Sequence, residues 1–461
     1  MSGADHGLGR VAVVGGGIAG LAAAVRLSRA GARVSLLEGS SQLGGLGTFF
    51  EHEGASLERF YHCVLPSDSH LLGLLRDVGI DARIDWTPTT FGYLHGGTLF
   101  PLNSPRDLLA FSPLRVADRL RVGLTGLWGR VTSARGLDDI TCVEWLTRLS
   151  GADAFERFWR PMLEAKFGDR YRDVPALWFW TRFNREKGKG PERKGYPRGG
   201  YRRLIEALAG AIVEAGGRIR LDAPVAEIGL DSDGAPWLRA GDAPAERFDR
   251  VVYTAPIGLL PRVAHRESLA PHLARVDTSI DMQGVINVVL VLRRSLSPHY
   301  WVATTDGSAP FQGIVESSHI IDRRALADRR LVYLTHYLHR SDPRFATPDE
   351  VVARTYVAAL KKCFPGLRRD DIEATRVFRS PFVEPLYTTG FSKRRPPECL
   401  VDGRIYLATT AQVYPAVTSW NGSVGLVERV VERVRSDAAR TGPVVAPSVD
   451  SGSQQLAERA A

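Results

Sequence analysis

The chain has 461 residues, of which 44% are hydrophobic and 24% charged, so it can bury a core large enough for two globular domains. Its four cysteines form no C-x-x-C pair, which excludes a disulfide framework and a cysteine-based zinc site and favours a reducing cytoplasm. The net charge of +9 is explained by solvated basic faces, with an anionic substrate or a membrane surface as alternatives; no basic run is interleaved with aromatic residues, so we expect no nucleic-acid partner.

The N-terminal part carries a dinucleotide-binding pattern. An apolar, β-branched run at residues 11–14 predicts a buried parallel strand, the glycines after it predict a tight turn, and residues 21–29 predict a helix. Gly15 can adopt the turn, Gly17 lets the backbone approach a pyrophosphate at the helix N-terminus, and Gly20 lets the helix pack closely on the strand.

A second strand completes this pattern and leads into another glycine cluster. Residues 33–37 predict a strand that ends in Glu38, whose carboxylate can accept hydrogen bonds from a ribose hydroxyl. Residues 39–48 follow, and their doublet Gly44-Gly45 would let a cofactor pass close to the backbone. An ordinary flexible loop is the alternative, but the place of this loop directly after Glu38 favours a flavin dinucleotide whose ring lies beyond it.

The next elements mix helices and strands. Residues 71–77 predict a helix, and residues 91–100 predict a hairpin with a glycine-rich turn. Ser112-Pro113 predicts the start of another helix, because a serine cap followed by proline at the first helical position is typical of helix N-termini.

The helix expected there is amphipathic and basic. Its apolar side chains recur on one face, at Val116, Leu120, Leu124 and Leu127, while arginines lie elsewhere. Packing against the substrate domain is the simpler explanation, and an anionic membrane surface, which would suit a lipid-soluble substrate, is the alternative. No apolar run is long enough to span a bilayer and no signal-peptide core precedes the first strand, so we expect membrane contact to be peripheral at most, at the inner face of the membrane.

The second half of the chain returns to strands. An aromatic-rich stretch at residues 159–185 indicates either pocket walls or core. Residues 285–292 and 331–335 predict buried strands, and residues 348–363 predict a helix. Strand, loop and helix then follow one another in residues 403–426.

Taken together, these motifs resemble the flavin-containing amine oxidoreductase superfamily, which includes monoamine oxidases, protoporphyrinogen oxidases, phytoene desaturases and, more distantly, UDP-galactopyranose mutases. The resemblance rests on the first motif, the doublet, a D-x-V-V-x-A-x-P-like segment that begins at Asp249 and the segment 403–426, and it covers most of residues 10–435. It implies an α/β fold with a Rossmann-like FAD-binding domain of the glutathione-reductase type and an inserted mixed α+β substrate domain. The implied FAD-binding domain comprises residues 8–65, 196–262 and 400–436, the substrate domain residues 66–195 and 263–399, and a disordered tail residues 437–461.

The resemblance also implies which residues hold FAD, and we expect the cofactor to be noncovalent because no attachment cysteine is evident. The implied contacts are Gly15, Gly17, Ile18, Ala19, Gly20, Glu38, Gly44, Gly45, Leu46, Gly47, Val225, Thr409, Thr410, Trp420, Asn421 and Val424. Two positions depart from the superfamily. Thr409-Thr410 stands where Gly-Asp is usual, so a neutral hydroxyl would have to replace the aspartate that helps hold the ribityl-phosphate, and Leu46 replaces an arginine.

Three residues are candidates for the chemistry. His62 lies in the part that leads the superfamily's chain past the flavin ring, and its intrinsic pKa suits an acid or base, with a structural histidine as the alternative. Lys166 matches, by order along the chain, a lysine that some relatives use through a water near the flavin N5. Tyr387 lies in a loop that in relatives approaches the active site.

We therefore expect an FAD-dependent oxidoreductase that takes hydride from a C–H bond of a small, anionic or lipid-soluble substrate onto flavin N5; the sequence leaves its oligomeric state open. A redox-neutral isomerase or mutase acting on a nucleotide sugar or lipid-linked substrate is the second hypothesis, favoured by the missing Gly-Asp and the basic charge. A binding protein on the same fold, as in the prenylated-GTPase escort proteins, is the third, and the intact glycine motif and Glu38 argue against it.

Overall fold

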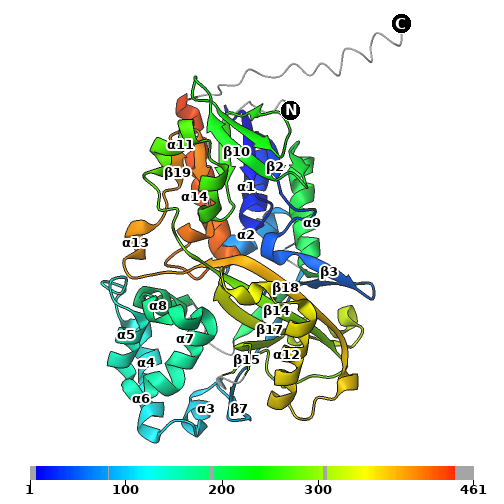
Figure 1. The fold of residues 1–461 in the computed structure, drawn as a ribbon, viewed down its shortest axis with the longest axis vertical. Helices are drawn as coiled ribbons and strands as arrows, with labels where there is room; N and C mark the ends of the chain where they lie inside the picture. Colours follow the sequence, from blue (N-terminus) through cyan, green and yellow to red (C-terminus); the bar gives the residue numbers. More distant parts are fainter. Residues whose placement is uncertain (1–6, 81–82, 186–191, 305–308, 442–461) are drawn as a thin grey trace.

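The computed structural model describes residues 7–80, 83–185, 192–304 and 309–441 (Figure 1). Its upper half in that view contains a six-stranded sheet in the order β19-β20-β13-β1-β2-β9. The strands are β1 (Arg10–Val14), β2 (Arg33–Leu37), β9 (Arg218–Arg220), β13 (Arg250–Tyr253), β19 (Cys399–Val401) and β20 (Ile405–Leu407). β1 lies between β2 and β13 and is parallel to both, so segments far apart in sequence build one sheet.

Both faces of this sheet are covered, which explains why β1 is apolar without alternation. On one face, Val11 and Val13 pack under α1 (Ile18–Arg29), α9 (Gly200–Glu214) and α14 (Trp420–Thr441). On the other, Ala12 and Val14 share a core with β10 (Val225–Leu230), β11 (Pro236–Ala240) and β12 (Glu246–Arg247), which form a small antiparallel sheet. The predicted α/β fold is confirmed, and the predicted strands at 11–14 and 33–37 agree with β1 and β2.

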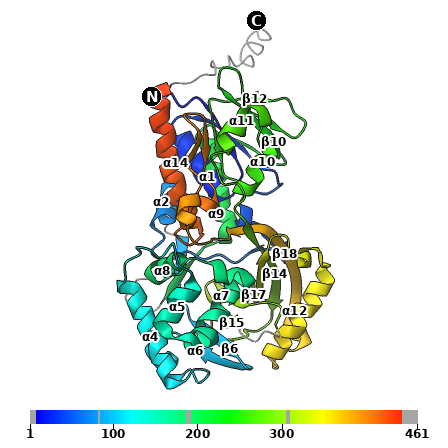
Figure 2. The same ribbon diagram turned by 60° about the vertical axis from the view of Figure 1, so that its left-hand side comes forward.

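The lower half is built on a seven-stranded sheet in the order β18-β14-β17-β16-β15-β6-β7 (Figures 1 and 2). Its strands are β6 (Phe91–His95), β7 (Thr98–Pro101), β14 (Met282–Leu292), β15 (Trp301–Thr304), β16 (Gly313–Glu316), β17 (Arg330–His339) and β18 (Ile372–Pro385). The predicted hairpin is β6 and β7, and the predicted strands and helix correspond to β14, β17 and α12 (Asp349–Cys363). α12 covers one face of the sheet, where Val352 and Leu360 pack against Val288 and Leu334.

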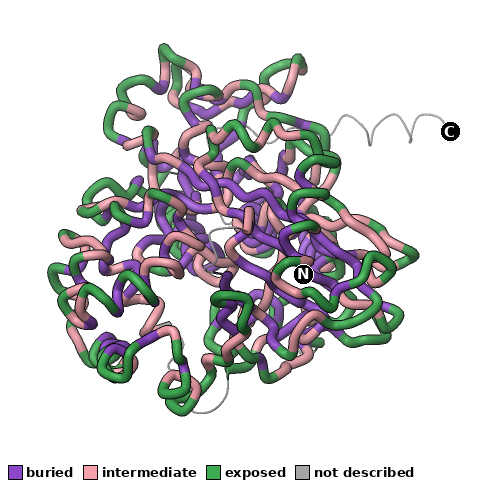
Figure 3. The backbone as a smooth tube through the Cα atoms, turned by 60° about the horizontal axis from the view of Figure 1, so that its bottom comes forward, coloured by how far each residue is buried: buried purple, intermediate pink, exposed green. Residues whose placement is uncertain are grey.

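Helices gather beside this sheet, as Figure 2 shows. They are α3 (Pro105–Ala110), α4 (Val116–Val131), α5 (Cys142–Ser150), α6 (Ala152–Ala154), α7 (Arg160–Phe167) and α8 (Ala176–Arg185). The remaining elements are α2 (Ser69–Asp77), α10 (Leu260–Val263), α11 (Arg266–Leu273), α13 (Phe391–Arg394), β3 (Phe49–His52), β4 (Ala55–Glu58), β5 (Ile84–Pro88) and β8 (Arg193–Pro197). Figure 3 shows that buried backbone runs through the centre of the molecule and exposed backbone lies at its rim. No helix within the described ranges has both the length and the apolar character needed to cross a bilayer.

Three sequence predictions need correction. The helix predicted to start at Ser112-Pro113 begins at Val116, and the serine-proline start belongs instead to α3, where the Ser104 hydroxyl accepts a hydrogen bond from the Asp107 N–H at 3.2 Å. The apolar face of α4 does not pack into the core, because Val116, Leu120, Leu124 and Leu127 are exposed.

The third correction concerns the C-terminal tail. α14 continues to Thr441, so residues 437–441 are helical and not part of a tail. Asp437 holds this last turn, because its buried carboxylate accepts hydrogen bonds from Arg433 and from the Tyr406 hydroxyl of β20. Residues 442–461, the rest of the predicted tail, lie outside the described residues.

Candidate functional site

The two glycine clusters meet at the N-terminus of α1. Gly15 adopts a left-handed backbone with φ of 103°, and the Gly44 N–H donates to the Gly16 carbonyl oxygen at 2.8 Å. Gly17, the residue before α1, provides no side-chain cap for the helix, and its backbone pairs with that of Gly44. No side chain caps the start of α1, so its first backbone N–H groups suit a phosphate group.

The space around each glycine shows whether protein packing alone requires a glycine at that position. A Cβ on Gly20 would overlap the Gly15 carbonyl oxygen, so Gly20 is needed for the turn to close on α1. A Cβ on Gly17 would have its nearest neighbour 3.9 Å away, at Gly45 Cα, so protein packing does not require a glycine there. The free space in front of Gly17 fits a bound pyrophosphate.

Glu38 lies at the end of β2, beside this turn. One carboxylate oxygen accepts a hydrogen bond from the Gly16 N–H at 2.6 Å, and the other accepts bonds from the N–H and hydroxyl of Ser40. The backbone of Glu38 also binds Ala223, two residues before Val225, which brings the start of β10 next to the same edge. Glu38, the predicted ribose contact, and Val225, another of the predicted FAD contacts, therefore lie at the same edge of the site.

The start of α14 closes the other side of the site. Trp420 packs so tightly on Gly47 that a Cβ on this glycine would overlap the indole. The Asn421 side chain accepts hydrogen bonds from the His70 and Leu71 N–H groups at 2.9 and 3.1 Å, so it caps α2. Val424 is fully buried in the core. Of these three side chains, Trp420 alone faces the glycine loop.

The turn that replaces the usual Gly-Asp is held by a residue that the sequence analysis did not single out. Thr409 is buried, and its N–H donates to the Gln412 side-chain oxygen at 2.7 Å. The Gln412 amide nitrogen donates to the Pro397 and Leu407 carbonyl oxygens, both at 2.9 Å. Gln412 thus organises the turn that precedes α14, and Thr410 is the first residue of this turn.

His62 is a half-buried, neutral histidine beside Trp420. Its ring centre lies 5.2 Å from that of Tyr201 and 5.4 Å from that of Trp420. Burial lowers the pKa of His62 to about 4, so the predicted titration near neutral pH is wrong. Nδ1 lies 2.9 Å from the Phe60 carbonyl oxygen, and because a carbonyl only accepts, the proton is on Nδ1 and Nε2 carries the lone pair.

Lys166 belongs to a polar cluster between α7 and the seven-stranded sheet. Its ammonium lies 2.5 Å from a carboxylate oxygen of Glu384 and 4.5 Å from the ring centre of Tyr337. The Tyr337 hydroxyl lies 3.2 Å from that of Tyr61, the residue before His62. We call Tyr61, Lys166, Tyr337 and Glu384 the Lys166 cluster; it connects Lys166 to the segment that carries His62.

Tyr387 is fully buried and lies near both groups. Its hydroxyl is 2.9 Å from that of Thr418, two residues before Trp420, and its ring packs against Phe391 and Tyr414. Burial and the charge of Glu384 raise the pKa of Tyr387, so this phenol stays protonated.

Sequence reasoning missed three members of the Lys166 cluster: Tyr61, Tyr337 and Glu384. A partial signal was present, because Tyr333 and Tyr337 are four residues apart in a strand and so lie on one face. The Tyr333 hydroxyl donates to the Glu58 carbonyl oxygen at 2.9 Å, so this face of β17 meets the segment around Tyr61. Nothing local marks Glu384, since only the pairing of β18 with β14 brings it there.

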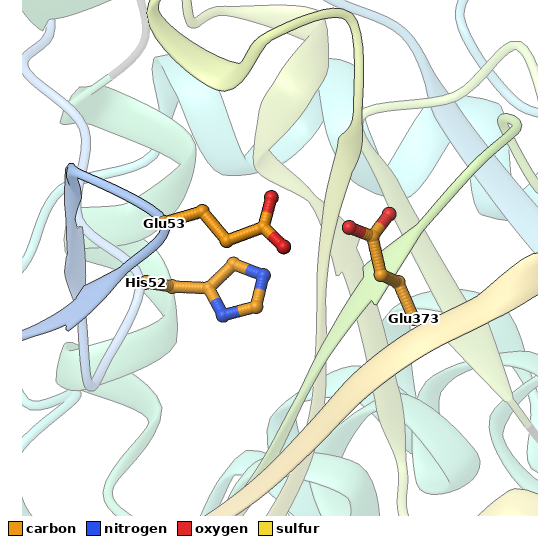
Figure 4. A group of neighbouring side chains, drawn as sticks. All are labelled: His52, Glu53 and Glu373. Carbon is orange, nitrogen blue, oxygen red and sulfur yellow. The ribbon is translucent and has the colours of Figure 1, made fainter.

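A second group of side chains lies away from this site. Ligand atoms of His52, Glu53 and Glu373 lie within 4.8 Å of one another, a spacing that suits a metal ion (Figure 4). However, the Arg329 guanidinium lies 2.8 Å from a carboxylate oxygen of Glu53 and 2.8 Å from one of Glu373. Because Arg329 already supplies the positive charge, this group is an ion-pair network.

Comparisons with known proteins agree with the geometry of the cofactor site. The family model for flavin-containing amine oxidoreductases matches residues 18–419. Zeta-carotene desaturase of Zea mays is 28% identical over 177 residues, which are 33% of this chain and 31% of that protein. The chain thus matches about a third of this relative's length.

Solved structures share the fold over almost the whole chain. A candidate protoporphyrinogen oxidase from Exiguobacterium sp. 255-15 superposes with a TM-score of 0.74 and 19% identity, over 95% of this chain and 100% of that one. Reduced UDP-galactopyranose mutase superposes with a TM-score of 0.72 and 15% identity, over 93% of this chain and 97% of that one. At these identities the comparison establishes the fold and no particular reaction.

Proposed function

Since this chain belongs to the flavin-containing amine oxidoreductase family, whose members are FAD-dependent oxidoreductases, we propose that it takes hydride from a C–H bond of a small organic substrate. Bound FAD supplies the hydride acceptor, and we propose that it is held without a covalent bond. The sequence carries no second dinucleotide fingerprint for a nicotinamide, so oxygen, a quinone or another acceptor is the proposed oxidant.

The residues that would hold the cofactor fit it. The open space at Gly17 and the start of α1, which no side chain caps, suit the pyrophosphate, and Glu38 suits the ribose. The backbone of the Gly44–Gly47 loop and the start of α14 border the path toward Trp420. The observation that carries the proposal is this convergence of two glycine turns and a helix start on one side of His62.

The chain's own groups would position the substrate and keep water out. The rings of Tyr201 and Trp420 enclose His62, whose neutral Nε2 can accept a hydrogen bond from a substrate N–H or O–H but is too weakly basic to hold a proton at neutral pH. In the Lys166 cluster, the phenols of Tyr61 and Tyr337 stay protonated because burial raises their pKa values. They offer hydrogen bonds, while Glu384 holds the ammonium of Lys166 in place.

The test is anaerobic reduction of the flavin by amines, isoprenoids, porphyrinogens and nucleotide sugars. We expect one class to bleach the flavin absorbance with saturable kinetics. His62→Ala should slow this reduction while the flavin content stays equal to that of the wild type. If no class reduces the flavin, the hydride-transfer proposal fails, and if His62→Ala reacts at the wild-type rate, His62 has no part in the chemistry.

A redox-neutral isomerase or mutase on a nucleotide sugar or lipid-linked substrate is the second candidate. Two observations favour it: Thr409-Thr410 replaces Gly-Asp, and the net charge of +9 would suit a diphosphate. Stoichiometric product formation without consumption of an acceptor would establish this reaction. A protein that is colourless and takes up no FAD would instead support a binding protein.

A further inference from the structure

The helix α4 is packed with its hydrophobic side outward. The large apolar side chains on one face are exposed by 53% to 76%; they are Val116, Leu120, Leu124, Leu127, Trp128 and Val131. They follow one another at helical spacing along the whole length of α4. Of the exposed large hydrophobic side chains in the described part of the chain, most belong to this face, and Leu109 of the neighbouring α3 adds to it.

The opposite face of α4 is the one that packs, and it is made of small and polar residues. Asp118, Val122, Thr125 and Gly129 are its buried positions. Gly129 allows the close approach, since a Cβ there would lie 2.7 Å from the Phe183 ring of α8. Hydrogen bonds from the Asn184 side chain to the Gly129 carbonyl and from the Trp180 indole to the Thr132 carbonyl, at 3.1 and 3.0 Å, fix this orientation.

Arginines border the exposed apolar face. Arg121 and Arg130 lie on its two edges, and Arg115 precedes its first residue; all three are exposed. The acidic side chains near this face are already engaged: Asp107 accepts a hydrogen bond from the Asn103 N–H, and Asp118 is buried and paired with Arg121. Asp153 of α6 lies 3.5 Å from the Arg115 guanidinium. The surface is therefore apolar at its centre and has arginines at its rim, of which Arg115 and Arg121 pair with Asp153 and Asp118.

This face also contains a shallow cavity. Its volume is about 520 Å³, and its lining includes Leu124, Leu127, Trp128 and Val131 of α4 together with Leu149 of α5. A surface cavity lined by apolar side chains can receive a lipid acyl chain, and arginines at its edge can reach the phosphate groups of the lipids.

We propose that the exposed face of α3 and α4 docks this protein onto the surface of a membrane that contains anionic lipids. Apolar side chains along α4 enter the interface, and arginines pair with lipid phosphates. A second copy of the chain fits this surface less well, because a symmetric contact would bring the arginine rims together, and the carboxylates beside them, Asp118 and Asp153, already pair with Arg121 and Arg115.

The position of α4 in the molecule agrees with this proposal. Figure 2 shows α4 along the outer edge of the lower half, with no element outside it, and the six-stranded sheet at the opposite end of the molecule. The helix can thus lie flat on a surface while the cofactor half faces the solvent. This inference does not depend on the proposed reaction.

The test is flotation of the FAD-loaded, full-length protein with lipid vesicles. We expect it to float with vesicles of phosphatidylcholine and phosphatidylglycerol and to bind phosphatidylcholine alone at least about tenfold more weakly. The triple variant Leu120→Gln/Leu124→Gln/Leu127→Gln keeps helix-forming residues and should lower the partition coefficient at least about tenfold. Arg115→Gln/Arg130→Gln should lower binding to the anionic vesicles only.

Val213→Gln is the matched control, because Val213 is 58% exposed on α9, away from this face. It should float like the wild type, and flavin absorbance and helical circular dichroism should be unchanged in every variant. Absence of flotation with anionic vesicles overturns the proposal. So does a concentration-dependent dimer that the triple leucine variant abolishes, since the face would then bind a second copy.

Discussion

Replacing Gly17 by alanine should separate cofactor binding from folding. The backbone of Gly17 has φ of −71° and ψ of −179°, a conformation that alanine adopts freely, and the nearest atom to the added Cβ is 3.9 Å away. The protein alone therefore has room for the methyl group. The unfolded chain loses freedom, so we expect the FAD-free protein to gain about 0.4–1 kcal/mol in its free energy of unfolding.

The same methyl group would occupy the space through which a pyrophosphate reaches the start of α1. Overpacking a tight contact costs about 1–3 kcal/mol, which corresponds to a Kd for FAD weaker by about 5- to 150-fold. Flavin fluorescence titration measures this constant, and chemical denaturation measures the stability.

Gly210→Ala on α9 is the control, since no atom lies within 4 Å of its added Cβ. It should be stabilised in the same way and should bind FAD like the wild type. Unchanged FAD affinity in Gly17→Ala would refute the assignment of the pyrophosphate to this turn.

Three further perturbations test the packing and charge of the molecule. Tyr196→Phe removes a 2.7 Å hydrogen bond to the buried carboxyl of Glu58, whose pKa is already raised by desolvation. The folded state of the variant binds the Glu58 proton more strongly than the unfolded state does, so the loss of about 1–2 kcal/mol in stability should grow from about pH 5 to pH 8. Thermal melts measure this loss, and a loss independent of pH would contradict the reasoning. Gly129→Leu should destabilise the protein by about 1–3 kcal/mol, because the new side chain would push α4 away from Phe183. Gly126→Ala should not, since no atom lies within 4 Å of its added Cβ. Equal denaturation midpoints for the two variants would show that the close approach of α4 and α8 is unimportant. Lys166→Met should lower the free energy of unfolding by about 3–5 kcal/mol, because the Glu384 carboxylate stays buried without its partner. The double variant Lys166→Met/Glu384→Gln should recover much of this loss. If it is no more stable than Lys166→Met, the ion pair is not the cause.

The cofactor half was predictable from sequence because its signals are local. Gly15 and Gly20 are required by a turn and a helix contact within a few residues, and the apolar run of β1 follows from its burial on both faces. The Lys166 cluster was not predictable, because Tyr61 lies 276 residues from Tyr337, and Tyr337 and Glu384 come together only because β17 and β18 both pair with β14. The ordinary pKa assumed for His62 failed for the same reason, since the burial that lowers it comes from distant rings.

An FAD-type dinucleotide fold and an amphipathic α4 with one apolar face could both be inferred from local sequence patterns. Which side of α4 faces the protein depends on its tertiary contacts. Hydrophobic periodicity marks the face that prefers to leave water, and in most helices that face packs into the core. In α4 the contact with α8 depends on the absence of a side chain at Gly129 and on hydrogen bonds from the Asn184 and Trp180 side chains to backbone carbonyls. Hydrophobic periodicity does not report either feature, and the leucine face of α4 is therefore exposed.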